Sequence, residues 1–120
     1  MKELKNKKIN TIIDNLLEKT LSGKINWERS DSINYRNGVY YWKWETEKYG
    51  RISINASHNV TGEDIIYFDI FNVNGVHIIE NQYLVSENSN IIKLYNHIQK
   101  EYDEKGAELI EKLLEELNNL

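Results

Sequence analysis

One stretch, residues 39–56, constrains the fold more than any other part of the chain. It reads Val-Tyr-Tyr-Trp-Lys-Trp-Glu-Thr-Glu-Lys-Tyr-Gly-Arg-Ile-Ser-Ile-Asn-Ala, and aromatic and β-branched residues dominate both of its halves. Such residues favour a pleated, half-buried strand. Lys48-Tyr49-Gly50 lies between the halves and suits a three-residue loop in which the glycine takes a positive φ. The stretch therefore predicts a β-hairpin.

The length of the hairpin loop decides which side chains share a face. A three-residue loop pairs Glu47 with Arg51 and Trp44 with Ile54, whereas a two-residue loop would mix apolar and polar side chains on both faces. We therefore expect one apolar face and one polar face. The apolar face carries Tyr40, Trp42, Trp44, Ile52, Ile54 and Ala56, and the polar face carries Tyr41, Lys43, Glu45, Arg51, Ser53 and Asn55.

Further strands are predicted on both sides of the hairpin. Residues 24–28 alternate apolar and polar side chains and predict a first strand, and residues 63–71 predict a fourth. Asn74-Gly75 predicts a type I′ turn into a fifth strand at residues 76–79. The fourth strand is apolar on both faces, so loops, the curl of the sheet, a dimer interface or a ligand covers its second face. The expected loops are residues 29–38 and 57–62.

Helices are predicted at both ends of the chain. Apolar residues recur at three- and four-residue spacing over residues 4–21, with Gly23 as the helix stop, and again over the last third of the chain. The second region crosses Gly106, so it is one long helix or two helices with a break at residues 103–106. Its last segment, acidic and rich in leucine, is expected to pack on the sheet or on the helix of a partner.

The order of these elements predicts an α+β fold in a single domain over residues 1–120. It comprises an N-terminal helix, an antiparallel sheet of about five strands built on hairpins, and a C-terminal helix or helix pair. The chain is 40% hydrophobic and 28% charged, as globular domains are, and contains no cysteine. It lacks a membrane-length apolar stretch and the apolar run of a secretory signal. We expect a cytoplasmic protein of a bacterial host that does not bind to a membrane.

Catalytic motifs are missing from the sequence. It contains no Gly-x-Ser-x-Gly, no phosphate-binding loop, no dinucleotide-binding glycine motif and no His-Glu-x-x-His. His58, His77 and His97 are spaced too irregularly for a metal site, and we expect them in a loop, on an exposed strand and at a helix boundary. We therefore predict no catalytic residues, no metal, no cofactor and no enzyme. The net charge of −4 argues against nucleic-acid binding, which needs a basic face.

Cationic and aromatic side chains gather between the first strand and the end of the hairpin. All three arginines of the chain, Arg29, Arg36 and Arg51, lie there. A guanidinium suits bidentate recognition of phosphate or carboxylate, and an aromatic ring can stack on a base. The competing interpretation is that the tryptophans are core, that Arg51 only pairs with Glu47, and that the rest is surface. The candidate ligand-binding residues are Tyr35, Arg36, Tyr41, Lys43, Tyr49, Arg51 and His58.

Residues 20–27, Thr-Leu-Ser-Gly-Lys-Ile-Asn-Trp, resemble a Thr-x-x-Gly-x-Ile-x-Trp motif of small α+β proteins from phages and bacterial mobile elements. In size and layout the chain is also similar to viral sponge proteins. Those proteins sequester nucleotide signals of bacterial defence, such as cyclic ADP-ribose derivatives and cyclic dinucleotides. The resemblance implies an anti-defence role and a homo-oligomer that binds a small nucleotide-like ligand without cleaving it. It assigns no residue.

An alternative function is a protein-interaction module, such as an inhibitor or immunity protein that covers a toxin or a defence enzyme. The acidic terminal helix and the negative net charge would suit a basic partner.

Overall fold

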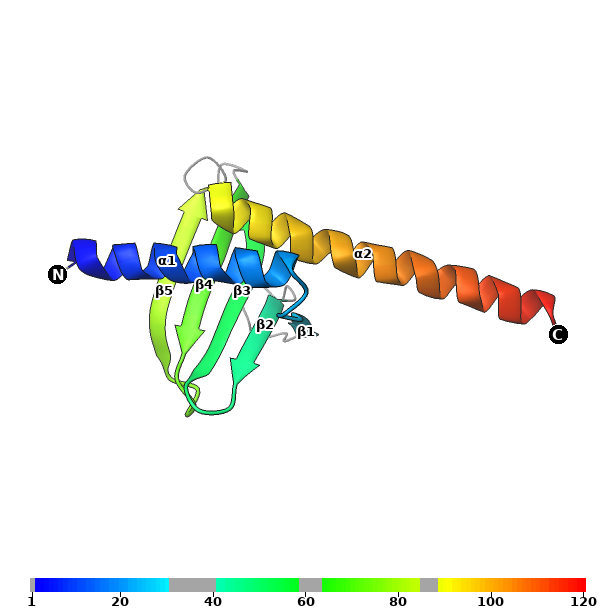
Figure 1. The fold of residues 1–120 in the computed structure, drawn as a ribbon, viewed down its shortest axis with the longest axis horizontal. Coiled ribbons are helices and arrows are strands. Elements are labelled where there is room, and N and C mark those ends of the chain that lie inside the picture. The colour runs from blue at the N-terminus through cyan, green and yellow to red at the C-terminus, as the bar shows by residue number, and fades with distance from the viewer. Residues whose placement is uncertain (1, 31–40, 59–63, 85–88) are drawn as a thin grey trace.

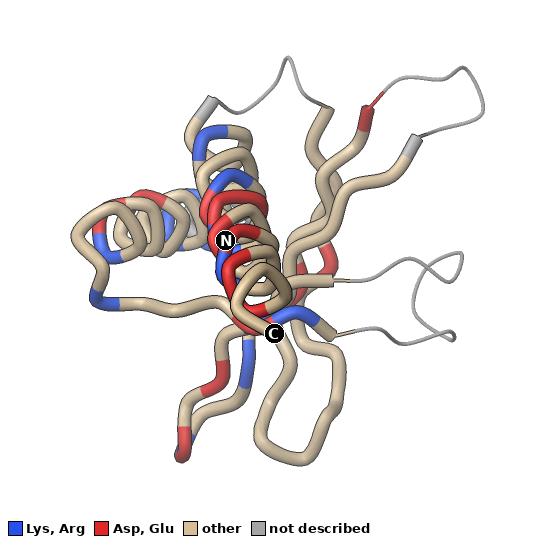
Figure 2. Tube along the Cα trace, turned by 90° about the vertical axis from the view of Figure 1, so that its right-hand side faces the viewer, with Lys and Arg blue, Asp and Glu red and all other residues tan. Residues whose placement is uncertain are grey.

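Two helices cross one face of a five-stranded antiparallel sheet in the part of the chain that the structure describes (Figure 1, Figure 2). The structure is a computed structural model and describes residues 2–30, 41–58, 64–84 and 89–120. Each strand pairs with the next one along the chain, in the order β1-β2-β3-β4-β5. The predicted α+β layout is therefore confirmed. The elements are α1 (Lys2–Leu21), β1 (Glu28–Ser30), β2 (Tyr41–Thr46), β3 (Gly50–His58), β4 (Asp64–Phe71), β5 (His77–Leu84) and α2 (Ser89–Asn118).

The core lies between the helices and the sheet. Apolar residues three and four positions apart on each helix form the stripe that packs there, because those positions share one helix face. The sheet contributes alternate residues of its three central strands. The buried core residues include Ile9, Ile13 and Leu16 of α1, Ile91, Leu94 and Ile98 of α2, and Trp42, Ile54, Ile66 and Phe68 of the sheet.

The hairpin of β2 and β3 has the predicted faces but a different register. Its pairs include Trp42 with Ile54 and Trp44 with Ile52, so the expected pairing of Trp44 with Ile54 is wrong. Compared with the prediction, β3 is shifted by two residues along β2, and an even shift leaves each described side chain on its expected face. The loop is therefore residues 47–49. Gly50 is part of β3 and keeps the predicted positive φ, at +131°.

Thr46 explains why the loop closes where it does. Its Oγ1 accepts the backbone N–H groups of Tyr49 and Gly50, each at 3.1 Å, and donates to the carbonyl oxygen of Gly50 at 3.0 Å. One hydroxyl thus satisfies the backbone groups that a tight turn would otherwise leave unpaired.

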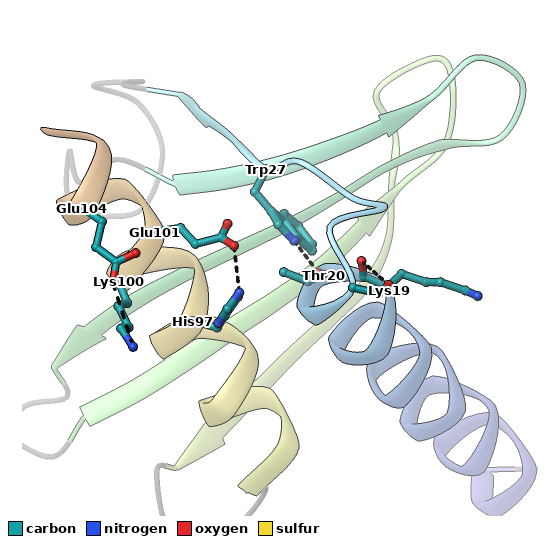
Figure 3. Close-up of polar contacts among 8 residues, drawn as sticks. Lys19, Thr20, Trp27, His97, Lys100, Glu101 and Glu104 are labelled. Atoms are coloured by element: carbon teal, nitrogen blue, oxygen red, sulfur yellow. Dashed lines mark hydrogen bonds and ion pairs between the residues drawn. The ribbon is translucent and has the colours of Figure 1, made fainter. Parts of the chain in front are cut away.

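The end of α1 explains why the first strand begins later than predicted. Gly23 has φ +77°, and the N–H of Lys24 returns to the carbonyl of Lys19 at 2.8 Å, in a Schellman motif. Trp27 Nε1 donates to the buried Thr20 Oγ1 at 2.9 Å (Figure 3). The predicted strand at residues 24–28 is therefore wrong, because this segment wraps the helix end. The motif residues Thr20, Gly23 and Trp27 act as a structural stop.

Two further strand boundaries differ from the prediction. Strand β3 runs through Ser57 and His58, which were expected in a loop, and β5 runs from His77 to Leu84 and not from 76 to 79. The turn between β4 and β5 is not a two-residue type I′ turn. Asn72 and Val76 close a longer loop, because Asn72 Oδ1 accepts the N–H groups of Asn74 and Val76 at 3.0 Å each.

Helix α2 runs without a break through Gly106, which settles the alternative left open by the sequence. Tyr102 anchors its first half, because the Tyr102 hydroxyl accepts from Arg29 at 2.9 Å and its ring meets Trp42 edge-on. Residues 103–120, which we name the arm, are all exposed and extend away from the sheet (Figure 1). Of the two alternatives expected for this segment, packing on the sheet is therefore excluded, and packing on the helix of a partner stays a prediction. We name the remaining described part the body.

Candidate functional site

The candidate site is the face of the sheet that points away from the helices, which we name the outer face. Alternation along each strand puts the polar half of the hairpin there, as predicted. Cross-strand pairing aligns Lys43 of β2 with Ser53 of β3, and then with Asp69 of β4 and Glu80 of β5. A neighbouring row contains Arg51, Phe71 and His77 in the same strand order. The fold thus gathers polar residues from four strands.

The structure places the predicted site residues in different surroundings. Tyr41, Lys43 and Arg51 share the outer face, and the Tyr41 side chain is buried there. Tyr49 is 82% exposed in the hairpin loop. His58 ends β3, opposite Asp64, and its side chain lies outside the described atoms. Tyr35 and Arg36 also lie outside the described residues, so their assignment stays a prediction.

Lys43 and Glu45 form an ion pair along β2, with Lys43 Nζ donating to Glu45 Oε1 at 2.9 Å. This hydrogen bond is the main cause of two opposite changes: it raises the pKa of Lys43 and lowers the pKa of Glu45. The pair is partly exposed, and such pairs are worth at most about 1 kcal/mol. An anionic ligand could therefore displace Glu45 from the Lys43 ammonium at low cost.

Arg51, Phe71 and His77 form an aromatic and cationic row. The Arg51 guanidinium carbon lies 4.4 Å from the centre of the Phe71 ring, and the His77 ring stacks on Phe71 at 4.5 Å. His77 Nε2 lies 2.9 Å from Oδ1 of Asp69, a carboxylate with no exposed surface. Burying a carboxylate is costly unless it is hydrogen-bonded, so His77 is held in place by Asp69.

Sequence reasoning missed Asp69 and His77 as members of the site. Asp69 interrupts an otherwise apolar strand, and that interruption was the available signal. His77 was expected to be an exposed strand residue, which overlooked its bond to a residue eight positions earlier.

Ser53 and Asn55 carry the most unusual feature of the outer face. They are 0% and 1% exposed, yet Ser53 Oγ and both polar side-chain atoms of Asn55 have no hydrogen-bond partner within the described part of the chain. A buried polar group left unpaired costs about 1–3 kcal/mol. Both residues were predicted on the polar face but not as site residues. The signal was a serine and an asparagine on either side of Ile54 in the central strand.

Two pockets open at the end of the sheet where the hairpins turn, and Arg51 lines both. One, of about 360 Å³, is bordered by Glu45 and Asn72, and it separates the two hairpin turns. The other, of about 260 Å³, is mainly apolar and is bordered by Trp44 and Tyr49. Arg51 therefore connects the outer face with a space large enough for a small molecule.

Serine, histidine and aspartate are all present on the outer face, but they do not form a nucleophilic triad. Ser53 Oγ accepts and donates no hydrogen bond among the described residues, whereas a triad serine bonds to its histidine. Within the same residues, no group of three or more histidine and acidic side chains is placed to hold a metal ion. No helix of the described chain has the length and apolar character needed to cross a membrane.

Comparison of the chain with protein families, with curated proteins and with solved structures finds no match.

Proposed function

We propose that this protein is a non-enzymatic binding protein that sequesters a small nucleotide-derived signalling molecule on the outer face of its sheet. It would act in the cytoplasm of a bacterial host, as an anti-defence homo-oligomer of phage or mobile-element origin. The observation that carries the proposal is the pair Ser53 and Asn55, whose buried polar atoms have no partner among the described residues. A ligand that bonds to them removes the cost of leaving them unpaired.

The chemistry around these two residues matches a nucleotide. An amide such as Asn55 both donates and accepts, as a base edge or a ribose hydroxyl requires, and Ser53 can do the same. Lys43 lies across the strand pair from Ser53, and Arg51 lies two residues before it, so both cations can meet phosphate oxygens. The Tyr41 ring shares this face and would contact a base, whereas the Phe71 ring is already covered by Arg51 and His77. Tyr35, Arg36, Tyr49 and His58 remain predicted contributors.

Isothermal titration against cyclic and linear ADP-ribose derivatives and cyclic dinucleotides tests the proposal. We expect a submicromolar binder, and Asn55→Leu to weaken it by roughly tenfold to a hundredfold, the equivalent of one or two buried hydrogen bonds. The same substitution removes two unpaired polar atoms, so we expect the thermal unfolding midpoint to stay level or rise. Lys48→Met, which removes a charge from the hairpin loop, is the control and should bind normally. A panel without a submicromolar binder rejects the proposal.

An interaction module directed at a toxin or defence enzyme is the second candidate. The observation in its favour is the row of Glu104, Glu108, Glu111 and Glu115 along the exposed arm, which suits a basic protein. Affinity capture from a host lysate separates the two functions. A stoichiometric protein partner supports the interaction module, and a heat-released small molecule supports the binding protein.

A further inference from the structure

The arm of α2 carries an apolar stripe with no counterpart in the body. All six of its large aliphatic side chains are between 50% and 94% exposed. These side chains are Leu109, Ile110, Leu113, Leu114, Leu117 and Leu120. Scattered exposed leucines are normal on a protein surface, but a contiguous row marks an interaction site. Residues 110, 113, 117 and 120 repeat at three- and four-residue spacing, which is the seam of a helix packed against another helix. Leu109 and Leu114 widen that seam.

Four of the six acidic residues of the arm favour a second copy as the occupant of this stripe. At 100° per residue, Glu104, Glu108, Glu111 and Glu115 lie on the side of the helix opposite the leucines. Pairing two stripes therefore turns these glutamates toward solvent and keeps them apart. A basic partner recognised through the stripe would instead find the acids on the wrong side of the helix. Figure 2 looks along α2 from its C-terminal end, with the acidic positions in red.

The size of the stripe is sufficient for a dimer. Twelve half-exposed aliphatic side chains, six from each copy, amount to roughly 1,000 Å² of buried surface, the size at which specific interfaces begin.

The position of the body favours an antiparallel direction of pairing. At 100° per residue, the leucine stripe is centred roughly a quarter turn around the helix from the buried stripe of Ile91, Leu94 and Ile98, which packs on the body. The leucines therefore face to one side of the body. Packed helices are about 8–10 Å apart, so a parallel pair would hold both bodies beside each other at the same end of the dimer. An antiparallel pair puts them at opposite ends.

We propose that two copies of this chain form an antiparallel dimer through the apolar stripes of their arms. The dimer gives the expected homo-oligomer a surface and a stoichiometry. It does not rest on the ligand, so a failed titration leaves it standing, and a monomer leaves the ligand site standing.

Sedimentation velocity on the full chain, at protein concentrations of about 1 to 100 µM, tests the dimer. We expect a monomer–dimer equilibrium that Leu113→Glu with Leu117→Glu weakens at least a hundredfold. Glu111→Gln with Glu115→Gln, on the opposite side of the helix, is the matched control and should dimerise at least as well as the parent. Circular dichroism checks that all variants keep their helix. A monomer at every concentration overturns the proposal, as does a double-glutamate variant that still dimerises.

A spin label tests the antiparallel arrangement, because the chain has no cysteine to interfere. In a Glu104→Cys chain, the two labels of an antiparallel dimer lie about 35 Å or more apart, given 1.5 Å of rise per residue. Labels in a parallel dimer are separated only by the width of two helices, about 20 Å. The shorter distance overturns the proposed arrangement.

Discussion

At the scale of single residues, Gly50 meets two requirements at once. Its φ of +131° is one that L side chains rarely adopt, and a Cβ at this position would overlap the carbonyl oxygen of Phe71. The first requirement comes from the hairpin loop, and the second from the close approach of β3 to the end of β4. Gly75 also has a positive φ, +79°, but open space surrounds it. A comparison of substitutions at the two glycines therefore distinguishes the cost of backbone strain from the cost of steric overlap.

We expect Gly50→Ala to destabilise the protein more than Gly75→Ala. A left-handed conformation costs a non-glycine residue about 1–2 kcal/mol, and Gly75→Ala should cost that much. Gly50→Ala adds the overlap with Phe71, for about 1–3 kcal/mol more. Urea unfolding of both variants measures the difference. Equal losses would mean that β3 and β4 can separate without cost.

Residue orientation could be predicted in the hairpin because strand side chains alternate with period two. Trp42 faces the core and Lys43 and Arg51 face outward, even though the predicted register was wrong, since an even displacement preserves alternation. The contact of His77 with Asp69 and the burial of Asn55 could not be predicted. Both depend on how β3, β4 and β5 align, and local patterns do not specify that alignment.

At the scale of elements, α2 is one helix in two environments. Its first half buries a stripe against the body, and the arm is exposed on every side. Leucine, glutamate, lysine and alanine, which make up most of the arm, are strong helix formers. Gly106 is the weak position, because glycine costs about 1 kcal/mol relative to alanine in a helix interior.

We expect Gly106→Ala to slow amide hydrogen exchange in the arm about fivefold, the equivalent of about 1 kcal/mol. A Cβ at this position meets no atom within 4 Å, so no clash opposes the gain. Ala107→Gly is the matched control and should speed exchange by a similar factor. Both are measured in the Leu113→Glu, Leu117→Glu background, so that dimerisation does not protect the amides. No change in either variant would show that the arm is not a helix in solution.

The types of the elements could be predicted, whereas some of their limits could not. Gly23 was identified as the helix stop from sequence alone, and the structure confirms it. The alternation in residues 24–28 resembles that of a strand. The strand prediction was wrong because Ile25 and Trp27 instead form hydrogen bonds to the end of α1. Whether α2 breaks at Gly106 was undecided, since a cost of about 1 kcal/mol is small beside the length of the helix.

At the scale of the whole molecule, the arm makes the protein elongated and concentrates its net negative charge at one end. The radius of gyration is 16.5 Å, against about 14 Å for a compact chain of this length. The arm holds six acidic residues and two lysines, a net charge of −4, which equals that of the whole chain. The remaining residues are therefore neutral in sum.

We expect the chain of residues 1–106 to unfold within about 2 °C of the full-length Leu113→Glu, Leu117→Glu variant. The arm buries no apolar side chain against the body, and Gly106 can end the shortened helix. Circular dichroism measures both midpoints, and small-angle scattering should show the radius of gyration falling towards the compact value. A midpoint lower by more than about 5 °C would mean that the arm supports the body.

The order of the strands has a consequence for how this chain reaches its fold. Because each strand pairs with its immediate successor, the sheet can grow by adding one short loop at a time. The sequence contains no proline, so no slow isomerisation of a prolyl bond delays any step. The late event is the meeting of the two ends of the chain, when α2 arrives beside α1. The sheet can thus be complete before α2 packs beside α1.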